Sequence, residues 1–588
     1  MEFVSGSPAT ELALARLSLA AVDPLVDRAL AYLNGICSVS GRLSPAALDE
    51  QQLASYDISF CVAEQRASRN LLDYAEQVAE QDALAVWVAC QFACEAINTV
   101  VGRLSSRPAD YGLSRADIVQ AVEKSEANGL ATFYLASARM AALGKALIKR
   151  EGDFLPANLD EEKLIIRDTF RRFASDVVMP LAEAIHRQDL DVPEEILQPL
   201  REMGCFGISI PERFDGLQPD SGDDSLYMIL VTEELSRGSL GAAGSLITRP
   251  EILARAVLNG GTDAQKSHWL PRVASGETLV AIALTEPDYG SDLASAKLKA
   301  TPAEGGWLLN GSKTWCTFAG SASVLLTLAR TGEEQDGYRG LSFFLVEKPR
   351  TEGHEFDVRQ DAGLGGGRLT GKAIPTLGYR GMHSFDVFFE NYFVSDANLV
   401  GGEAGVGKGF YYAMMGLTGG RMQTSARAAG IMQAACEQAI GYARQRKVFA
   451  QPVADYQLTL VKFSRMITTL LASRQFSYAV AREVDAGGGQ MAASLVKLFA
   501  CRAAEWVTRE ALQIHGGMGY AEEVPVSRYF VDARVLSIFE GAEETLALKV
   551  ISRELIARAG DEKSADKKPA DKEPGGNKTT DNESEAAA

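Results

Sequence analysis

Two stretches far apart in the sequence contain the residue types best suited to chemistry. The first, residues 281–318, reads as short strands and the polar loops that end them. It offers three hydroxyl side chains and one flat indole: Thr285, Ser291, Thr317 and Trp315. This set suits a flat heterocycle with polar edges. A surface hairpin with a turn at Asn310-Gly311 is the simpler alternative.

The second stretch combines a glycine-rich turn with an acid downstream. Residues 513–520, QIHGGMGY, end a helical pattern with glycines that permit left-handed turns and close backbone approach. Residues 532–541, DARVLSIFEG, place Glu540 just before Gly541. Taken alone, Glu540 also fits an acid near the start of the next helix.

Composition is that of a soluble globular protein of several domains. The 588 residues are 46% hydrophobic and 23% charged, and a chain of this length suggests about three or four domains. The net charge of −18 argues against nucleic acid as a partner. The apolar run at residues 83–94 is too short to span a bilayer, and the first 16 residues resemble no export signal. We therefore expect no membrane contact and a cytoplasmic location.

Cysteine and histidine usage gives no sign of a metal. The eight cysteines form no CxxC pair, so we expect buried thiols in a reducing compartment. The five histidines show no paired spacing, and we expect no metal ion.

Periodicity predicts a mainly α-helical chain with a central β domain. We expect an N-terminal helical extension at 1–155, a helical domain at 156–279, a β domain at 280–400, a helical bundle at 401–560 and a disordered tail at 561–588. In the extension, Ser44-Pro45 predicts the start of a long helix whose apolar face begins at Leu53, and another helix is expected from 112 to 149. A packing or assembly role suits the extension, although it could also cover a site.

Two glycine-rich segments need separate interpretation. Residues 361–375, DAGLGGGRLTGKAIP, are either a mobile surface loop or a loop that presents Arg368 or Lys372 to an anion. Residues 402–409, GEAGVGKG, nearly match a phosphate-binding loop, but Gly409 replaces the hydroxyl residue that binds magnesium. A hinge before the next helices is the better interpretation.

The two stretches together resemble the acyl-CoA dehydrogenase family. The motifs ALTEPDYGSD, GSKTWCT, QIHGGMGY and the segment ending in Glu540 occur in that order across roughly residues 160–560. The resemblance implies a helical domain, a β-barrel-like domain and a four-helix bundle, together with FAD. It also implies an acyl-CoA thioester substrate, electron-transferring flavoprotein as acceptor and a homodimer or homotetramer.

The resemblance assigns roles residue by residue. Leu284, Thr285 and Thr317 would contact the flavin, with Trp315 beside it, and Ser291 and Gly541 would lie near the acyl-CoA. The FAD of a neighbouring subunit would be contacted by Arg446, Phe449, Gln513, Gly516 and Gly517. Glu540 matches the catalytic base, because only a desolvated carboxylate can remove the weakly acidic α-proton of a thioester.

Departures from the family pattern point to the substrate. Ala542 stands where the family often has Thr, residues 363–375 lengthen a link, and the extension lies outside the common plan. Ala542 implies that one FAD hydrogen bond is missing or replaced. The extension, the glycine-rich link and the segment GKAIPTLGYRGMHSF together resemble members of the family that act on a short branched dicarboxylyl-CoA. Its free carboxylate needs a cation, and the candidates are Arg249, Arg368, Arg380 and His383. The alternatives are another short-chain, branched-chain or glutaryl-type substrate, an oxidase-like relative, a thioester desulfinase and a non-enzymatic assembly protein.

Overall fold

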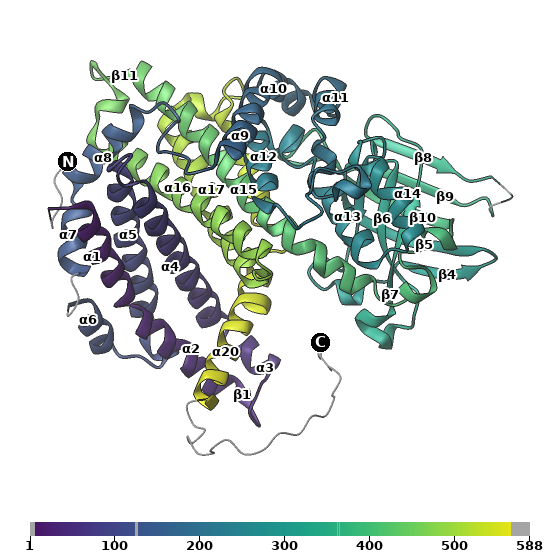
Figure 1. Cartoon of the computed structure of the whole chain (residues 1–588), viewed down its shortest axis with the longest axis horizontal. Coiled ribbons are helices and arrows are strands. Elements are labelled where there is room, and N and C mark those ends of the chain that lie inside the picture. The colour runs from purple at the N-terminus through teal and green to yellow at the C-terminus, as the bar shows by residue number, and fades with distance from the viewer. Residues whose placement is uncertain (1–5, 124–126, 362, 364, 566–588) are drawn as a thin grey trace.

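A computed structural model describes residues 6–123, 127–361, 363 and 365–565. The helical regions pack directly on one another, and the sheet lies at one end of the molecule (Figure 1). The long C-terminal helices lie between the N-terminal extension on one side and the β domain on the other (Figure 1). The predicted fold, mainly α with a central β domain, is confirmed.

The extension is helical with one short hairpin. Its elements are α1 Pro8–Ala20, α2 Asp23–Cys37, β1 Ser38–Val39, β2 Arg42–Leu43, α3 Pro45–Glu50, α4 Gln52–Val78, α5 Leu84–Ser106, α6 Arg115–Glu123, α7 Ala127–Tyr134 and α8 Ser137–Ile148. Ser44 does cap a helix, but this helix, α3, ends at Glu50 and α4 begins separately. Leu53 is exposed rather than buried. The helix expected over 112–149 is also wrong, because three shorter helices occupy that span.

Helix α5 is longer than the apolar run suggested. By length and composition its 23 residues could cross a membrane, yet 78% of the apolar window is buried inside the protein. It packs against α4 and α1 in the same apolar core that contains α16 and α17. The extension is therefore joined to the C-terminal bundle by continuous packing.

A second helical block leads into the sheet. It contains α9 Glu161–Phe173, a π-helical turn at Ala174–Val178, α10 Met179–Gln188, α11 Glu194–Glu202, α12 Ser225–Gly238, α13 Thr248–Gly260 and α14 Asp263–Ala274. Asp160 caps α9, and Thr262 with Gln265 forms a capping box on α14. These local signals explain why the helices start where they do.

The β domain is one curled sheet of eight strands. They are β3 Val280–Ala283, β4 Lys299–Ala303, β5 Gly306–Thr317, β6 Val324–Arg330, β7 Leu341–Glu347, β8 Glu355–Arg359, β9 Arg368–Ala373 and β10 Ser384–Ser395. The order is β3-β6-β4-β5-β10-β9-β8, with β7 also paired to β6. Along β6, Val324 and Leu326 face α13 and α14, whereas Leu325 faces the core on the other side of the sheet.

The glycine-rich segment at 361–375 includes the start of a hairpin strand. Residues 362 and 364 lie outside the described residues, and Arg368 to Ala373 form β9, paired with β8. Arg368 bonds Asp357 and Lys372 bonds Glu355, both across the hairpin. Both side chains are therefore paired with carboxylates. The alternative in which this loop presents Arg368 or Lys372 to an anionic ligand is not supported.

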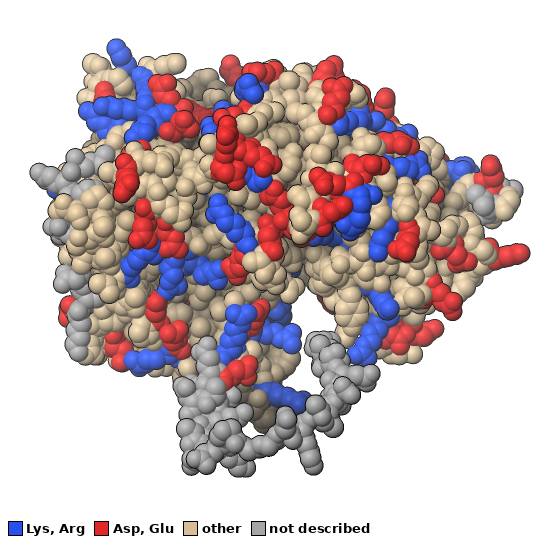
Figure 2. Space-filling model, viewed as in Figure 1, with Lys and Arg blue, Asp and Glu red and all other residues tan. Residues whose placement is uncertain are grey.

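The C-terminal region is a helical bundle. It contains α15 Gly409–Gln445, β11 Lys447–Val448, β12 Gln451–Pro452, α16 Gln457–Asp485, α17 Gln490–His515, α18 Val526–Leu536, α19 Glu543–Thr545 and α20 Ser552–Ala565. Helix α15 begins directly at the end of the expected hinge. Helix α20 covers 561–565, which were expected to belong to the tail, and 566–588 lie outside the described residues. On the face shown in Figure 2, acidic and basic side chains are interspersed over the described surface.

Candidate active site

Glu540 lies in the short link between α18 and α19. Its backbone has a φ of 54°, and Gly541 follows with a φ of 96°. A non-glycine residue in this left-handed region is uncommon and is often found where a side chain must be aimed. Lys497 of α17 donates to the Gly541 carbonyl at 2.5 Å, which fixes the link against the bundle.

Two adjacent glycines of α15 make room for two carboxylates. A Cβ placed on Gly420 would lie 2.6 Å from Glu540 Oε2. A Cβ on Gly419 would lie 2.0 Å from Glu251 Oε1. Glu540 and Glu251 therefore approach the same turn of α15, one from the C-terminal link and one from α13.

Three buried guanidinium groups surround these acids. Arg249 is 7%, Arg421 7% and Arg427 0% exposed. Burial lowers the pKa of Arg421 and of Arg427, and in each case the nearby charge of Glu540 acts in the opposite direction. Burial also lowers the pKa of Lys497, again opposed in part by Glu540. The site holds more cations than carboxylates.

A buried hydrogen-bond network ties this cluster together. Thr248 donates to Gln423 at 2.5 Å, and the Gln423 amide donates to Glu251. Arg427 reaches Thr248 and stacks over the Phe539 ring at 5.3 Å. Burial raises the pKa of Glu251 to about 7, against the opposing charge of Arg255 and with further support from Glu540.

Some donors in this network have no described partner. The Nε atoms of Arg421 and Arg427 are buried without a hydrogen-bond acceptor among the described residues. Glu251 Oε1 is buried without a hydrogen-bond donor there and lies 3.9 Å from Arg255 Nε. A buried guanidinium N–H without an acceptor is costly. An anionic ligand would provide such an acceptor.

The β domain contributes the second half of the site. Trp315, with a φ of 57°, is 56% exposed at the end of β5, and the Thr317 hydroxyl lies 2.9 Å from the Ser384 hydroxyl. The Thr314 N–H donates to the Thr285 carbonyl at 2.9 Å. These contacts place the indole and the two threonines on neighbouring segments.

A buried ion pair supports the loop that carries Thr285. Lys313 Nζ donates to Glu286 Oε1 and to the Leu284 carbonyl, each at 2.8 Å. Glu286 also accepts from the backbone N–H groups of Lys297 and Leu298. The loop between β3 and β4 is thus held in one conformation.

Two contacts connect the halves. Tyr379 accepts from Arg249 at 3.0 Å, and its ring meets Phe539 edge-on with centroids 5.5 Å apart. Thr545 donates to Ser291 at 3.0 Å, which brings that predicted acyl-CoA residue beside the helix that follows Glu540. The sheet and the base therefore face one another.

The other five predicted FAD residues lie at one end of the bundle and are exposed. Arg446 and Phe449 follow α15, whereas Gln513, Gly516 and Gly517 end α17. Tyr442 stacks on His515 with ring centroids 4.5 Å apart, which holds the two helix ends together. Phe449 is 94% exposed. These residues have no described contact with Glu540.

Of the four predicted carboxylate-binding residues, only Arg249 lies in the Glu540 cluster. Arg368 is bound to Asp357 on the hairpin. Arg380 donates to the carbonyls of Thr376 and His186. His383 lies between Asp189 and Asp191. The last three candidates are therefore bonded to other protein groups. Residue type alone could not predict these tertiary pairings.

Sequence reasoning missed Glu251, Arg421 and Arg427. The available signal was the Gly419-Gly420 pair inside a helical pattern, since glycine there costs helix stability and points to a close approach.

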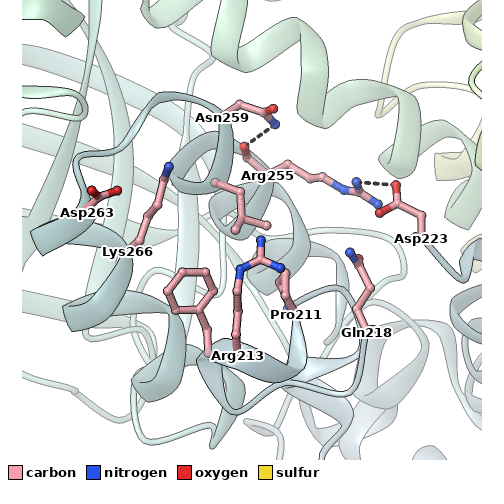
Figure 3. Close-up of a pocket in the computed structure, with 10 residues that line it drawn as sticks. Pro211, Arg213, Gln218, Asp223, Arg255, Asn259, Asp263 and Lys266 are labelled. Carbon is pink, nitrogen blue, oxygen red and sulfur yellow. Dashed lines mark hydrogen bonds and ion pairs between the residues drawn. The ribbon is translucent and has the colours of Figure 1, made fainter. Parts of the chain in front are cut away.

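A separate cavity of about 410 Å³ lies elsewhere (Figure 3). Its walls include Arg213, Gln218, Asp223, Arg255 and Lys266. Arg255 is bonded to Asp223 at 2.7 Å, as Figure 3 shows. Arg255 connects this cavity to the Glu540 cluster, because its Nε lies 3.9 Å from Glu251 Oε1.

Comparison with known families identifies the fold and its chemistry. The acyl-CoA dehydrogenase N-terminal domain matches residues 160–277, the middle domain 281–392 and the C-terminal domain 407–556. The chain belongs to the acyl-CoA dehydrogenase family, whose members are FAD-dependent oxidoreductases. It is therefore an enzyme of that class.

Several known proteins are similar to this chain over most of their length. The chain is 38% identical over 559 residues to (2S)-methylsuccinyl-CoA dehydrogenase of Cereibacter sphaeroides, covering 93% of this chain and 98% of that one. It is similar to a glutaryl-coenzyme A dehydrogenase in complex with glutaryl-CoA, with a TM-score of 0.60 and 28% identity over 69% of this chain and 98% of that one. A chain in a structure of the electron transferring flavoprotein of Acidaminococcus fermentans gives a TM-score of 0.61 and 29% identity, covering 69% and 99%.

Proposed function

We propose that this protein is an FAD-dependent dehydrogenase of a short branched dicarboxylyl-CoA, namely (2S)-methylsuccinyl-CoA, and that its product is mesaconyl-CoA of the ethylmalonyl-CoA pathway. The observation that carries this proposal is the cluster of Arg249, Arg421 and Arg427 around Glu540. An acyl group without a second carboxylate would leave that excess of buried positive charge without a counter-ion. The Cereibacter sphaeroides relative, which this chain matches over nearly its whole length, supports the same substrate.

Glu540 is the proposed base. Its carboxylate takes the α-proton of the thioester, while FAD supplies, when bound, a hydride acceptor at N5 for the β-hydrogen. Loss of one proton and one hydride balances the formation of the α,β double bond. The carboxylate lies among buried groups, which favours proton transfer from carbon over competition from water.

The three arginines are the proposed counter-ions of the distal carboxylate. A guanidinium offers a planar pair of N–H donors that fits a carboxylate, and the unpaired Nε atoms of Arg421 and Arg427 are donors of this kind. With the carboxylate bound, the charge of the cluster comes closer to neutrality. Arg249 is held ready by Tyr379 and the Ser245 carbonyl.

The residues of the β domain fit a flavin. Trp315 presents a flat exposed ring, and Thr285 and Thr317 offer donors near it. Leu284 lies in the same loop, and Ser291 and Gly541 are proposed to line the acyl-CoA. Exposed Arg446 and Phe449, with Gln513, Gly516 and Gly517, are proposed to contact the FAD of a second subunit. We therefore propose a homodimer or homotetramer.

The proposed electron acceptor is electron-transferring flavoprotein, supported by the Acidaminococcus fermentans structural neighbour. A cytoplasmic location and the domain boundaries at 155, 279, 400 and 560 belong to the same proposal.

A dehydrogenase of glutaryl-type or other short or branched acyl-CoA is the second candidate, favoured by the glutaryl-CoA neighbour. Oxygen consumption with substrate would distinguish an oxidase.

The deciding experiment is an anaerobic titration of the purified flavoprotein. We expect (2S)-methylsuccinyl-CoA to bleach the flavin absorbance, with glutaryl-CoA and butyryl-CoA much weaker. Glu540→Gln should retain the flavin and lower the rate by about 10²–10⁴-fold, the usual contribution of a general base. Bleaching by butyryl-CoA alone would retain the family and overturn the dicarboxylyl substrate.

A matched pair of arginine variants tests the carboxylate site. Arg249→Lys should lower kcat/KM for methylsuccinyl-CoA by about 10–100-fold, because it loses a charge-assisted bond of about 1.5–3 kcal/mol. The kcat/KM for butyryl-CoA should change little. Arg368→Lys, at the exposed hairpin, is the control and should leave both values unchanged. Equal losses for both substrates in Arg249→Lys would contradict selective carboxylate binding.

A further inference from the structure

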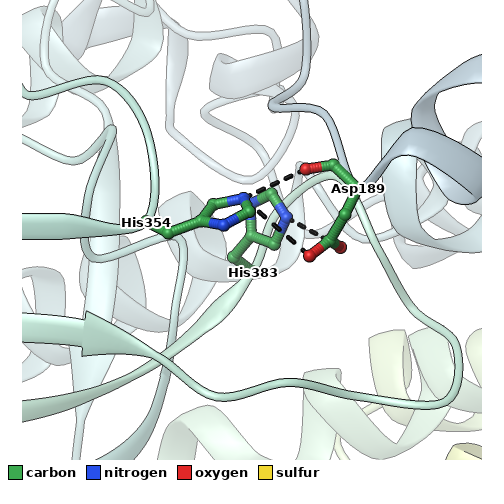
Figure 4. A group of neighbouring side chains, drawn as sticks. All are labelled: Asp189, His354 and His383. Atoms are coloured by element: carbon green, nitrogen blue, oxygen red, sulfur yellow. Dashed lines mark hydrogen bonds and ion pairs between the residues drawn. The ribbon is translucent and has the colours of Figure 1, made fainter.

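A compact group of metal-ligating side chains joins the helical domain to the β domain away from Glu540. Asp189 ends α10, His354 precedes β8 and His383 precedes β10, as Figure 4 shows. One ligand atom from each residue lies within 4.8 Å of the others. Sequence spacing could not reveal the group, because its members are separated by 165 and 29 positions in the chain.

The hydrogen bonds of His383 define which ring nitrogen is available. Asp191 accepts from the Gly353 N–H at 2.7 Å, and its other oxygen lies 3.1 Å from His383 Nδ1. A carboxylate can only accept there, so Nδ1 carries the proton. In the neutral ring, Nε2 then points a lone pair at Asp189 Oδ1, 3.2 Å away. Two acceptors facing each other at that distance need either a proton, which makes His383 an imidazolium, or a metal ion between them.

This arrangement is the one found around metal-bound histidines. A ligating imidazole commonly donates its other N–H to a carboxylate that fixes its orientation. Here Asp191 would be that outer carboxylate, and His383 Nε2 and Asp189 would be ligands. The separation of 3.2 Å between them matches the spacing of about 3.3 Å expected for tetrahedral ligands at about 2.0–2.1 Å from zinc.

His354 completes the set. Its ring centroid is 4.3 Å from that of His383, and its Nε2 lies 3.0 Å from the Asp189 carbonyl and 3.9 Å from Asp189 Oδ2. Its side chain is 45% exposed, so it can turn toward an ion entering from solvent. The Asp189 carbonyl offers a further oxygen ligand.

One neighbouring cation competes for the site. Arg380 Nε lies 3.6 Å from Asp189 Oδ1 and already offsets part of that carboxylate's charge. The opposite oxygen, Oδ2, faces His354. Arg380 Nε and His383 Nε2 approach the same oxygen, Oδ1, at 3.6 and 3.2 Å. Arg380 Nε also donates to the Thr376 carbonyl at 3.1 Å, so it keeps an acceptor when an ion occupies Oδ1.

We propose that Asp189, His354 and His383 bind a divalent transition-metal ion of the zinc class, with Asp191 orienting His383. Two imidazoles and one carboxylate form a borderline-soft ligand set that favours zinc over magnesium or calcium. The ion would hold the loop between α10 and α11 against the segment that leads from Tyr379 to His383. Because Tyr379 contacts Arg249, the site would stabilise the position of one wall of the Glu540 cluster.

The test uses the full-length holoenzyme purified without a histidine tag. We expect about one zinc per subunit by inductively coupled plasma mass spectrometry after dialysis against Zn²⁺, and one-site binding by calorimetry. Zn²⁺ should also raise the Tm, and EDTA should reverse that rise. His354→Ala removes an exposed side chain, so it should fold normally while losing at least about 100-fold in zinc affinity.

Two further variants make the outcome decisive. His268→Ala changes another exposed-face histidine, which bonds only Arg272 among the described residues, and should bind zinc like the parent. Asp191→Asn should weaken zinc binding by about 10–100-fold, the usual effect of losing an outer carboxylate. Substoichiometric zinc in the parent, or equal affinity in the parent and His354→Ala, would overturn the proposal and leave His383 as an imidazolium paired with two aspartates.

Discussion

Glu540 and Glu251 meet on one turn of α15, and their environments differ. Glu540 lies half-buried on a left-handed link, whereas Glu251 is 1% exposed and bonded to Gln423. The motif ending in Glu540 made the base predictable from the sequence. Glu251 was not predictable, because it belongs to a helix whose relation to α15 depends on packing between distant segments.

The space left by Gly420 should be required for the base. Gly420→Ala would place a methyl group 2.6 Å from Glu540 Oε2, so the carboxylate must move. A displacement of this size can lower a catalysed rate by about 10²-fold. Stopped-flow flavin reduction at saturating substrate would measure it.

Gly441→Ala, in the same helix, is the control for that change. A Cβ there meets nothing within 4 Å, so alanine should gain about 0.5–1 kcal/mol of helix stability and leave the rate unchanged. Equal rates in the two variants and the parent would show that Gly420 does not position Glu540.

The raised pKa of Glu251 should make stability depend on pH. Its folded pKa of about 7 exceeds the ordinary glutamate pKa of 4.5, mainly because of burial, so between these pH values only the folded state keeps the proton. Stability should therefore fall as pH rises from about 4.5 to about 7 and stay level above, a loss of about 3 kcal/mol. Glu251→Gln removes this contribution, and Tm measured from pH 5 to pH 8 should fall less steeply than in the parent.

The exposed Glu304→Gln is the reference for that series and should leave the slope unchanged. Parallel Tm curves for the parent and Glu251→Gln would show that the Glu251 carboxyl ionises normally in the folded protein.

Helices were predictable where an apolar periodicity coincided with a capping residue, as in α9, which Asp160 caps, and α12, which Asp224 caps. Prediction failed where a pattern continued across a break, as between α6 and α8, because periodicity does not register short turns. The start of α15 at Gly409 agrees with the hinge expected over residues 402–409. The domain boundaries stay predictions.

Helix α4 of the extension reaches the segment that follows the base. Tyr56 donates to Glu543 at 2.5 Å, and Arg502 of α17 bonds the same carboxylate. Ser59 donates to the Ala547 carbonyl at 2.9 Å. The extension therefore supports α19, three residues beyond Glu540, and does more than cover an apolar face.

Tyr56→Phe should loosen this contact without removing the ring. A hydrogen bond to a charged group contributes about 1.5–3 kcal/mol, so the Tm of the holoenzyme should fall by a few degrees. The rate of flavin reduction should change by less than about twofold, because Glu540 itself is untouched. Tyr32→Phe, at a surface tyrosine of α2, is the matched control and should leave the Tm unchanged. An unchanged Tm in Tyr56→Phe would show that the bond contributes nothing.

The extension, the β domain and the exposed ends of α15 and α17 lie on different sides of the molecule (Figure 1). The extension covers α16 and α17 through one continuous apolar core, while the β domain lies at the opposite end of the molecule (Figure 1). The far ends of α15 and α17 expose aromatic side chains, Phe449 at 94% and Tyr520 at 89%. Such exposed aromatics are typical of an interface with a partner. The family motifs identified this end in the sequence, but they give no partner geometry.

Phe449→Ala therefore tests the proposed shared cofactor site. If Phe449 packs against the FAD of a second subunit, its truncation should cost more than 1 kcal/mol at that contact, or about tenfold in FAD affinity. The purified variant should then show a lower ratio of flavin to protein absorbance, and light scattering across protein concentrations should show a shift toward smaller assemblies. Excess FAD should restore both. Leu377→Ala removes another highly exposed apolar side chain, at 83%, and should change neither quantity. Full flavin occupancy in a monomeric Phe449→Ala variant would contradict a site shared between subunits, because cofactor binding would then be independent of assembly.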